Sequence, residues 1–160
     1  MVERVRTRER FKLSLAVFLI LLKEERAVFL LRSDTGWMDG KYSVPGGVKE
    51  PTETLQQAII REAQEEVGAV IQPENLLLAH MMHNFTTGQE WIGAFFITDK
   101  WEGNLDVKEP HKHGELRWLP LDDLPANTSP YVRQAIRHYL MGSQYSEYGW
   151  EIPDDENLYI

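Results

Sequence analysis

Three glutamates of one predicted helix have the spacing to bind a metal ion together. Each residue of an α-helix advances by about 100°, so Glu62, Glu65 and Glu66 fall within an arc of roughly 100°. Their carboxylates would repel one another unless a positive charge lies among them. Oxygen ligands of this kind suit Mg²⁺ or Mn²⁺, which keep bound waters and contact substrate phosphates. The alternative is an acidic, solvated helix face, which is the usual role of such clusters.

The helix itself is predicted from its caps and its apolar stripe. It covers residues 54–67, where Thr54 and Gln57 have the spacing of a capping box and Gly68 suits a left-handed cap. The apolar stripe beside the glutamates consists of Ile59, Ala63 and Val67. Packing of this stripe against a sheet would hold the carboxylates at the edge of a cleft.

A longer motif surrounds the glutamates and decides between the two interpretations. From Gly47 the chain reads GVKEPTETLQQAIIREAQEEVGA, which resembles the signature of the Nudix (MutT-like) hydrolase family. That signature is G, five residues, E, seven residues, then R-E-U-x-E-E-x-G-U, where U is bulky and aliphatic. The matching fixed positions are Gly47, Glu53, Arg61, Glu62, Glu65, Glu66 and Gly68. Ala63 and Ala69 depart from the signature, because the family prefers Ile, Leu or Val there.

The resemblance extends beyond this motif and implies a fold. Residues 42–47, YSVPGG, are similar to the family's aromatic-x-x-Pro-Gly-Gly entrance to the motif. Similarity to the closing part of nucleotide-hydrolysing members is found at residues 109–112, 116–118 and 123–125. The implied fold is of the α/β class, an α/β/α sandwich with a mixed central sheet. Residues 1–141 are expected to form this domain, and residues 142–160 a loosely held tail that is aromatic and then acidic.

The resemblance also assigns roles at the site. It implies that Glu62, Glu65 and Glu66 bind Mg²⁺ or Mn²⁺ together with the backbone carbonyl of Gly46. A further acidic residue from a later loop often assists as a ligand or a base in the family. Glu109 is the favoured residue for this role, with Glu115 as the alternative.

Two more residues of the motif would position the ligands. The resemblance implies that Glu53 is either a supporting ligand or a hydrogen-bond partner of Arg61. Arg61 precedes Glu65 by one helical turn, so it is placed to orient that carboxylate by a charge-assisted hydrogen bond.

The implied reaction is hydrolysis of a nucleoside diphosphate linked to another group, in which cations neutralise the diphosphate and lower the pKa of a bound water. A nucleoside triphosphate, cleaved to monophosphate and pyrophosphate, is the favoured substrate. ADP-ribose or another nucleotide-sugar is the alternative. However, relatives that cleave ADP-ribose commonly carry a proline shortly after the motif, and dinucleoside-polyphosphate hydrolases a tyrosine, where this chain has Asn84, Phe85 and Thr86. A third alternative, a nucleotide-binding module without turnover, normally has a decayed motif.

Aromatic and amide side chains are candidates for contact with the nucleotide base. The aromatic candidates are Trp37, Tyr42, Phe85, Trp91 and Trp118. Phe85 is favoured because it falls in the polar segment 84–89, which is expected to be a loop after a strand. Asn127 lies where nucleotide-hydrolysing relatives place polar groups that contact the base, although it would equally cap a turn.

The histidines give a weaker signal for a metal site. His80 and His83 form one pair, and His111 and His113 another, and neither pair has a third ligand at a characteristic spacing. His80 is therefore expected in a sheet, and His111 and His113 on a loop near the substrate.

The remaining elements follow from apolar runs and turn residues. Strands are expected at residues 13–22, 27–31, 76–82, 91–98 and 115–119, and residues 42–47 are expected to form a short strand that runs into a glycine turn. A closing helix is expected at residues 130–141. The run at 13–22 is too short to span a bilayer, and charged residues follow it where a signal peptide would be cleaved. No membrane association is expected.

Composition excludes several classes of protein. The chain has 160 residues, of which 42% are hydrophobic, which suits one compact domain. A net charge of -8 disfavours binding to nucleic-acid backbones, so the expected partner is a small nucleotide. The absence of cysteine excludes disulfides and thiolate metal sites, and the cytoplasm is the expected location. The sequence leaves a homodimer open.

Overall fold

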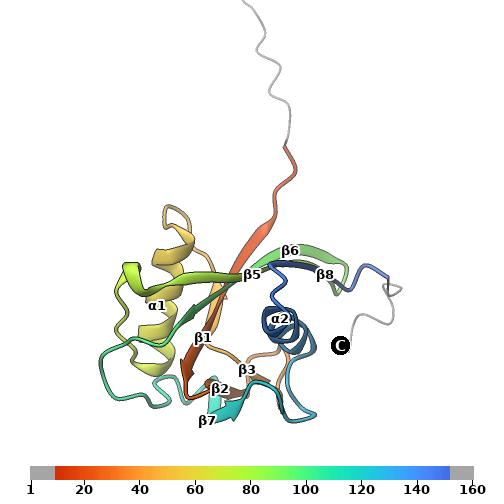
Figure 1. Ribbon diagram of the computed structural model, residues 1–160. Helices are drawn as coiled ribbons and strands as arrows, with labels where there is room; N and C mark the ends of the chain where they lie inside the picture. Colours follow the sequence, from red (N-terminus) through yellow and green to blue (C-terminus); the bar gives the residue numbers. More distant parts are fainter. Residues whose placement is uncertain (1–9, 152–160) are drawn as a thin grey trace, which may run out of the picture.

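The computed structural model describes residues 10–151, which form an α/β/α sandwich (Figure 1). Within this range one mixed sheet of eight strands lies between two α-helices, α1 (Leu55–Val67) and α2 (Pro130–Leu140). The strands are β1 (Ser14–Lys23), β2 (Arg26–Arg32), β3 (Tyr42–Ser43), β4 (Gly46–Val48), β5 (Leu77–Thr86), β6 (Gln89–Thr98), β7 (His113–Pro120) and β8 (Tyr145–Tyr148). The short 3₁₀ helix η1 (Pro73–Asn75) precedes β5. This architecture confirms the predicted fold class.

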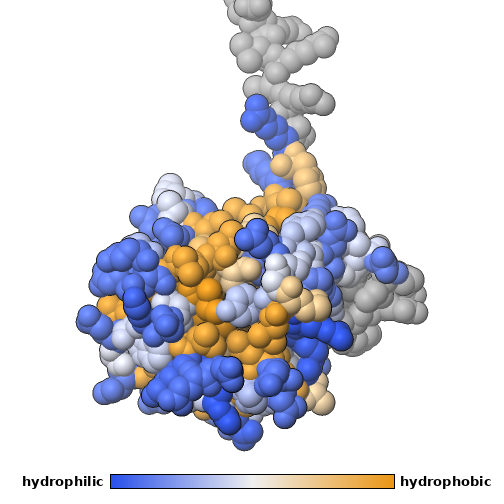
Figure 2. All heavy atoms as spheres, viewed as in Figure 1, coloured by the Kyte–Doolittle hydropathy of each residue, from blue (hydrophilic) through white to orange (hydrophobic). Residues whose placement is uncertain are grey.

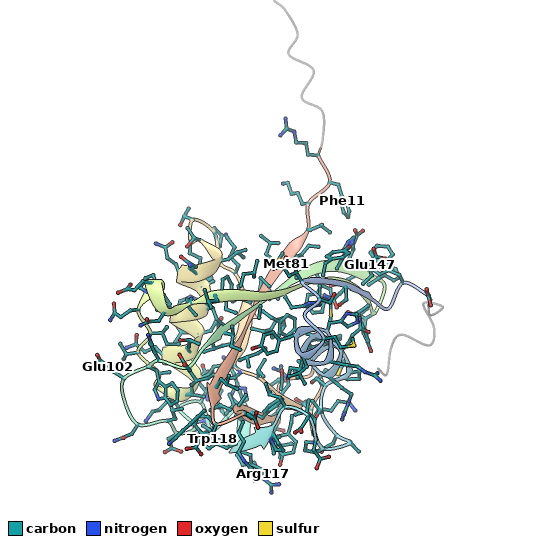
Figure 3. The ribbon with its side chains drawn as sticks, viewed as in Figure 1. Phe11, Met81, Glu102, Arg117, Trp118 and Glu147 are labelled. Atoms are coloured by element: carbon teal, nitrogen blue, oxygen red, sulfur yellow. The ribbon has the colours of Figure 1, made fainter. Side chains whose placement is uncertain are left out.

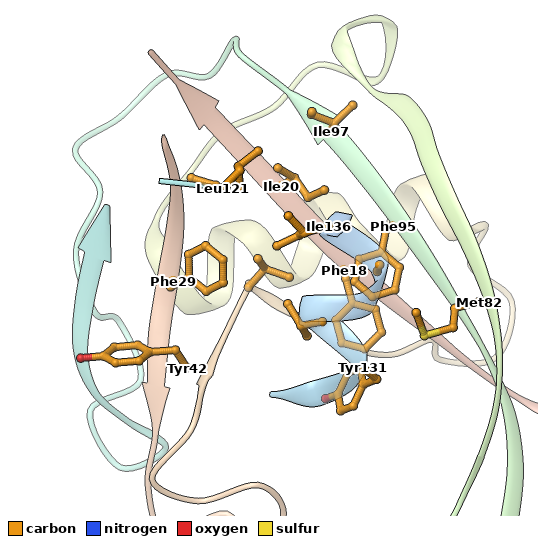
Figure 4. Packing of buried hydrophobic residues seen from close by; sticks show 14 of the residues in the cluster. Phe18, Ile20, Phe29, Tyr42, Met82, Phe95, Ile97, Leu121, Tyr131 and Ile136 are labelled. Carbon is orange, nitrogen blue, oxygen red and sulfur yellow. The ribbon is translucent and has the colours of Figure 1, made fainter. Parts of the chain in front are cut away.

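The central strand β1 is buried on both faces of the sheet. Because side chains alternate along a strand, Phe18 and Ile20 pack toward α2, whereas Leu19 and Leu21 pack toward α1. Figure 4 shows the first of these layers, with Phe18 beside Phe95 and α2 beneath them. Burial on both faces explains why the sequence of β1 reads as a continuous apolar run.

The pairing of β1 brings the glycine segment to the centre of the molecule. β1 pairs in parallel with β6 along most of its length, but with β2 only at its end, where Leu22 faces Ala27. The edge that β2 leaves free is occupied by β4, in which Gly47 faces Val17. The chain that leads into α1 is therefore fixed against β1.

Helix α1 has the caps and the buried stripe that its sequence predicts. The Thr54 hydroxyl accepts a hydrogen bond from the backbone N–H of Gln57 at 3.1 Å, and the Gln57 side chain accepts one from the Thr54 N–H at 2.8 Å. Gly68 ends the helix in a left-handed conformation, with φ of 75°. Ala63 and Ala69, the two departures from the Nudix signature, are fully buried, so small side chains suit the tight contact between helix and sheet here.

The hairpin of β5 and β6 is longer than predicted. Residues 84–89 were expected to form a polar loop, but the strands continue until Thr86 faces Gln89. Thr87 and Gly88 alone form the turn, and both have positive φ, as a two-residue hairpin turn requires. The prediction of a loop was wrong because polar residues here take part in backbone pairing, and Phe85 consequently lies in a strand.

The expectation of a loosely held tail is wrong for residues 145–148. These residues form β8, which pairs in parallel with β5 at the edge of the sheet. Ser146 and Tyr148 are buried while Tyr145 and Glu147 are exposed, which is the alternation of a strand with one covered face. The acidic residues 152–160 lie outside the described residues.

The molecular surface reflects this layering. On the face shown in Figure 2, apolar side chains gather in the middle, between the regions of α1 and α2, and hydrophilic side chains surround them. None of the helices in residues 10–151 is long and apolar enough to cross a membrane.

Replacement of Tyr148 by alanine tests whether β8 is an integral part of the domain. We expect Tyr148→Ala to lower the free energy of unfolding by about 3 kcal/mol, because it removes a buried aromatic side chain from the core. Tyr145→Ala, in the same strand but exposed, should change it by less than about 0.5 kcal/mol. Urea unfolding followed by circular dichroism measures both. Equal, small effects would show that β8 adds nothing to the stability of the domain.

Candidate active site

Glu66 is a buried carboxylate between α1 and β4. Its exposed fraction is only 5%, and its Oε2 accepts a hydrogen bond from the backbone N–H of Gly46 at 2.9 Å. Burial raises the pKa of Glu66 from 4.5 to about 8, and the nearby Glu62 and Glu109 add to the rise, although the bond from Gly46 opposes it. The charged form of Glu66 therefore lacks a sufficient positive partner in the protein.

Glu62 lies beside Glu66 and is held close to β4. Burial raises the pKa of the Glu62 carboxyl, although Arg61 opposes this shift. A Cβ atom on residue 47 would lie 2.5 Å from the Glu62 Oε1, so only glycine lets the carboxylate approach the strand this closely. A Cβ atom on residue 46 would lie 2.1 Å from the Val17 carbonyl oxygen, which excludes any side chain there.

Arg61 connects the outer glutamates of the site. Its Nη2 and Nε donate to the two carboxylate oxygens of Glu53, at 2.8 and 3.1 Å. Its Nη1 donates to Glu62 at 2.9 Å and to Glu65 at 3.2 Å. These bonds hold the pKa of Glu53 at about 2, well below its usual 4.5. Glu53 is thus a hydrogen-bond partner of Arg61, which is one of the two roles that the sequence leaves open.

A later segment brings a third carboxylate and a histidine to Glu66. Ligand atoms of Glu66, Glu109 and His113 all lie within 4.8 Å of one another. Glu109 also accepts a bond from Lys112 at 3.0 Å. Glu115, the alternative to Glu109, instead pairs with the Tyr42 hydroxyl and with Arg117. The structure therefore brings Glu109, and not Glu115, to the glutamates of α1.

His113 differs from its expected place on a loop. It is the first residue of β7 and is only 3% exposed. Burial, together with the positive charge of Arg32, lowers the pKa of its imidazole to about 4, so the ring is neutral. The sequence predicts a strand that begins at Glu115, because Gly114 before it is typical of a turn. The observed strand begins two residues earlier, at His113.

The donors around Glu66 fit a divalent cation. Two carboxyl groups have raised pKa values because they are buried near one another, which a bound cation would reverse. They border a cavity of about 470 Å³, the carboxylate cavity, whose wall includes Gly46, Gly47, Glu62, Glu66 and His113. Carboxylate oxygens and a neutral imidazole are ligands that divalent cations accept. Glu65 is half exposed, with 50% of its side chain accessible, and it lines a separate hollow beside Arg61 and Gln64 instead of the carboxylate cavity.

A second cavity adjoins the first. This aromatic cavity, of about 500 Å³, shares Arg32, Gly46, Gly47 and Val48 with the carboxylate cavity. Its wall includes four aromatic residues, Phe18, Trp37, Trp91 and Tyr131. Trp91 meets Tyr131 edge to face at 5.4 Å, and Figure 4 shows Tyr131 beside Phe18.

Arg32 stands where the two cavities meet. Its Nε donates to the Trp37 carbonyl at 2.8 Å, and its Nη2 to the Thr35 hydroxyl at 3.1 Å. These bonds fix the guanidinium in the wall of both cavities. Sequence analysis did not single out Arg32, because a lone arginine at the end of a strand carries no motif.

The structure does not bring Phe85 or Asn127 to either cavity within residues 10–151. Phe85 packs on Trp150, with ring centroids 5.3 Å apart. The Asn127 amide donates to the Gly40 carbonyl at 3.1 Å. Trp118, another aromatic candidate, lies on β7 at the edge of the molecule (Figure 3) and packs on Trp101. Trp37 and Trp91 are the candidates that do line the aromatic cavity.

Comparison with known proteins agrees with this site. A model of the NUDIX domain family matches residues 12–139, which include all the glutamates described above. The chain belongs to the Nudix family. It is therefore a hydrolase, and Nudix hydrolases use divalent metal ions.

Nudix proteins with several substrates resemble this chain. An Escherichia coli (strain K12) protein named 8-oxo-dGTP diphosphatase is 31% identical over 128 residues, which are 79% of this chain and 98% of that protein. An ADP-ribose pyrophosphatase of Methanocaldococcus jannaschii is 26% identical, over 66% of this chain and 61% of that protein. The crystal structure of a MutT NUDIX hydrolase from Burkholderia pseudomallei has a TM-score of 0.73 and 23% identity, covering 79% of this chain and 98% of that one.

The raised pKa of Glu66 predicts how the stability of this Nudix domain depends on pH without metal. The folded protein keeps a proton on Glu66 that the unfolded chain releases, so stability should fall by about 1–2 kcal/mol as the pH rises from 6.5 to 8. The lowered pKa of His113 acts in the opposite direction, but only below its usual value of 6.5. Urea unfolding in EDTA measures the trend.

Glu66→Gln is the control for this pH dependence. Because glutamine does not titrate, the variant should lose most of the decline and be more stable than the parent at pH 8. Equal slopes in the parent and the variant would contradict the assignment to Glu66.

Proposed function

We propose that the chain hydrolyses a nucleoside triphosphate to a nucleoside monophosphate and pyrophosphate, with Mg²⁺ or Mn²⁺ bound at the glutamates of α1. The observation that carries the proposal is the joined pair of cavities. One cavity presents carboxylates and Arg32, which suits a metal-bound phosphate chain, and the other presents aromatic rings, which suit a base. The E. coli relative, named for a nucleoside triphosphate, supports this substrate class.

The glutamates of α1 would hold the metal. Glu62 and Glu66 would contribute carboxylates from the wall of the carboxylate cavity, and Glu65, which Arg61 links to Glu62, would contribute a third. The Gly46 carbonyl would complete the set, since Gly46 lies in the same wall. A divalent ion held there neutralises charge on the diphosphate and lowers the pKa of a bound water.

Other residues would orient these ligands and accept the proton of the water. Arg61 fixes Glu62 and Glu65, and Glu53 holds Arg61 through both of its oxygens. Glu109 is the proposed assisting carboxylate, as a further ligand or as the base, because it reaches Glu66 from a different segment of the chain and is part exposed. Its bond to Lys112 keeps the carboxylate in place.

The aromatic cavity would bind the nucleoside. Trp37 and Trp91 come from separate segments and line the same space, where a planar base would pack against aromatic rings. Phe85 and Asn127 would contribute only if the segments that hold them moved toward the cavity. Arg32 would meet the charge of the phosphate next to the nucleoside, since it lies where the cavities join.

Product analysis in heavy-oxygen water tests the reaction. With Mg²⁺ or Mn²⁺, we expect monophosphate and pyrophosphate from a triphosphate, with the label on one of them, because the held diphosphate exposes an inner phosphorus to attack. The panel should include 8-oxo-dGTP, unmodified triphosphates and ADP-ribose. Orthophosphate as the first product from every triphosphate would overturn the mechanism. Monophosphate from ADP-ribose alone would show that the chain is instead a nucleotide-sugar hydrolase.

Neutralising the ligands tests the assignment of residues. Glu62→Gln and Glu66→Gln should each reduce turnover by at least about a hundredfold, because each removes a ligand charge with almost no change of volume. Glu74→Gln, the same substitution at an exposed residue of η1, is the matched control and should leave turnover unchanged. Native circular dichroism is required of all three. Full activity of either site variant at saturating Mg²⁺ would contradict the assignment.

A further inference from the structure

His113 is a buried histidine whose side chain has an unusual lack of partners. It begins β7, where it faces Arg32 of β2, and its exposed fraction is only 3%. Its Nδ1 has no hydrogen-bond partner among the described residues. Its Nε2 lies 3.7 Å from the Glu66 Oε1, which is longer than a hydrogen bond. The buried Nδ1 without a partner costs stability, and the other ring nitrogen, Nε2, faces the Glu66 carboxylate.

The distances around His113 suit a shared cation. Two ligand atoms about 2.1 Å from one octahedral ion are about 3.0 Å apart when adjacent and about 4.2 Å apart when opposite. The separation of 3.7 Å between His113 and Glu66 lies between these values. Glu109 belongs to the same group, whose ligand atoms all lie within 4.8 Å of one another. The three ligand atoms therefore lie close enough together to share one ion after local adjustment of their side chains.

We propose that His113 is a nitrogen ligand of a metal ion that Glu66 and Glu109 also bind, and that it makes this site prefer Mn²⁺ to Mg²⁺. The inference rests on the metal dependence in the proposed function and goes beyond it. It adds a ligand from β7 to the carboxylates of α1 and assigns a preference between two cations.

The preference follows from the chemistry of the ligands. Mg²⁺ demands oxygen ligands and exchanges its waters reluctantly, so an imidazole adds little to its binding. Mn²⁺ also binds carboxylates. As a first-row transition metal, it accepts an imidazole nitrogen more readily than Mg²⁺ does. A site with two carboxylates and one imidazole therefore gains more affinity for Mn²⁺ than for Mg²⁺.

Spectroscopy of the full chain with Mn²⁺ tests this ligand directly. Electron spin-echo envelope modulation of the bound Mn²⁺ should show coupling to ¹⁴N, and the coupling should change when the protein is labelled with ¹⁵N-histidine. This measurement uses the unmodified chain and requires no variant to fold. Calorimetric titration of Mn²⁺ and Mg²⁺ into the same protein gives the affinity for each ion.

Variants identify which histidine gives the signal. His113→Gln should abolish the coupling and weaken Mn²⁺ binding by about tenfold, while Mg²⁺ binding changes by less than about twofold. The matched control is His111→Gln, because His111 lines the same cavity but is exposed. That variant should keep the coupling and both affinities.

The outcomes separate this inference from the proposed function. Bound Mn²⁺ without histidine nitrogen coupling, loss of the coupling in His111→Gln, or an equal loss of Mg²⁺ and Mn²⁺ affinity in His113→Gln would each overturn the role of His113 and leave the metal dependence standing. Failure of the unmodified chain to bind either ion would instead overturn the metal dependence of the proposed function.

Discussion

The segment that contains Gly46 and Gly47 lies between β1 and the glutamate face of α1, and there is no room in it for a side chain. Residue 46 is confined by the backbone of β1, and residue 47 by the Glu62 carboxylate. This close approach lets the Gly46 N–H reach Glu66, and it places Gly46 in the wall of the carboxylate cavity. A bulkier segment would separate the helix from the sheet, so that the bond from Gly46 to Glu66 and this part of the cavity wall would be lost.

The charges of the site are divided into two unequal groups. Arg61 lies on the outer side and satisfies Glu53 through two bonds, while it also reaches Glu62 and Glu65. On the inner side, Glu66 has one backbone donor and a neutral histidine nearby. Arg61 thus neutralises Glu53 and part of the charge of Glu62 and Glu65, whereas Glu66 has no ion pair with a lysine or arginine of residues 10–151, which leaves a deficit of positive charge there. Such a deficit costs stability in the folded chain and favours the binding of a cation.

Local signals in the sequence predicted the helix and its glutamates well. The caps, the apolar stripe and the spacing of Glu62, Glu65 and Glu66 all depend on residues within one or two turns of each other, so helical geometry fixes their arrangement. The pairing of Glu53 with Arg61 also lies within the motif. Glu109 was predicted from the resemblance alone, since its contact with Glu66 spans a long stretch of chain.

Features that depend on distant segments could not be predicted in the same way. The aromatic cavity joins Trp37 from a loop, Trp91 from β6 and Tyr131 from α2. Phe85 was favoured as a base contact, but alternation along β5 directs it away from the side on which its neighbour Thr86 lines the cavity. The turn at Thr87 and Gly88 determines this alternation, and a shift of one residue in that turn would reverse it.

The position of β8 has a consequence for the order in which the protein is completed during synthesis. β5 is made well before β8, so until residues 145–148 leave the ribosome β5 is an open edge with free backbone donors and acceptors. Tyr148, which packs on Tyr131 with ring centroids 6.5 Å apart, arrives at the same late stage. Because Tyr131 also lines the aromatic cavity, the nascent chain contains the glutamates of α1 long before the wall of that cavity is supported.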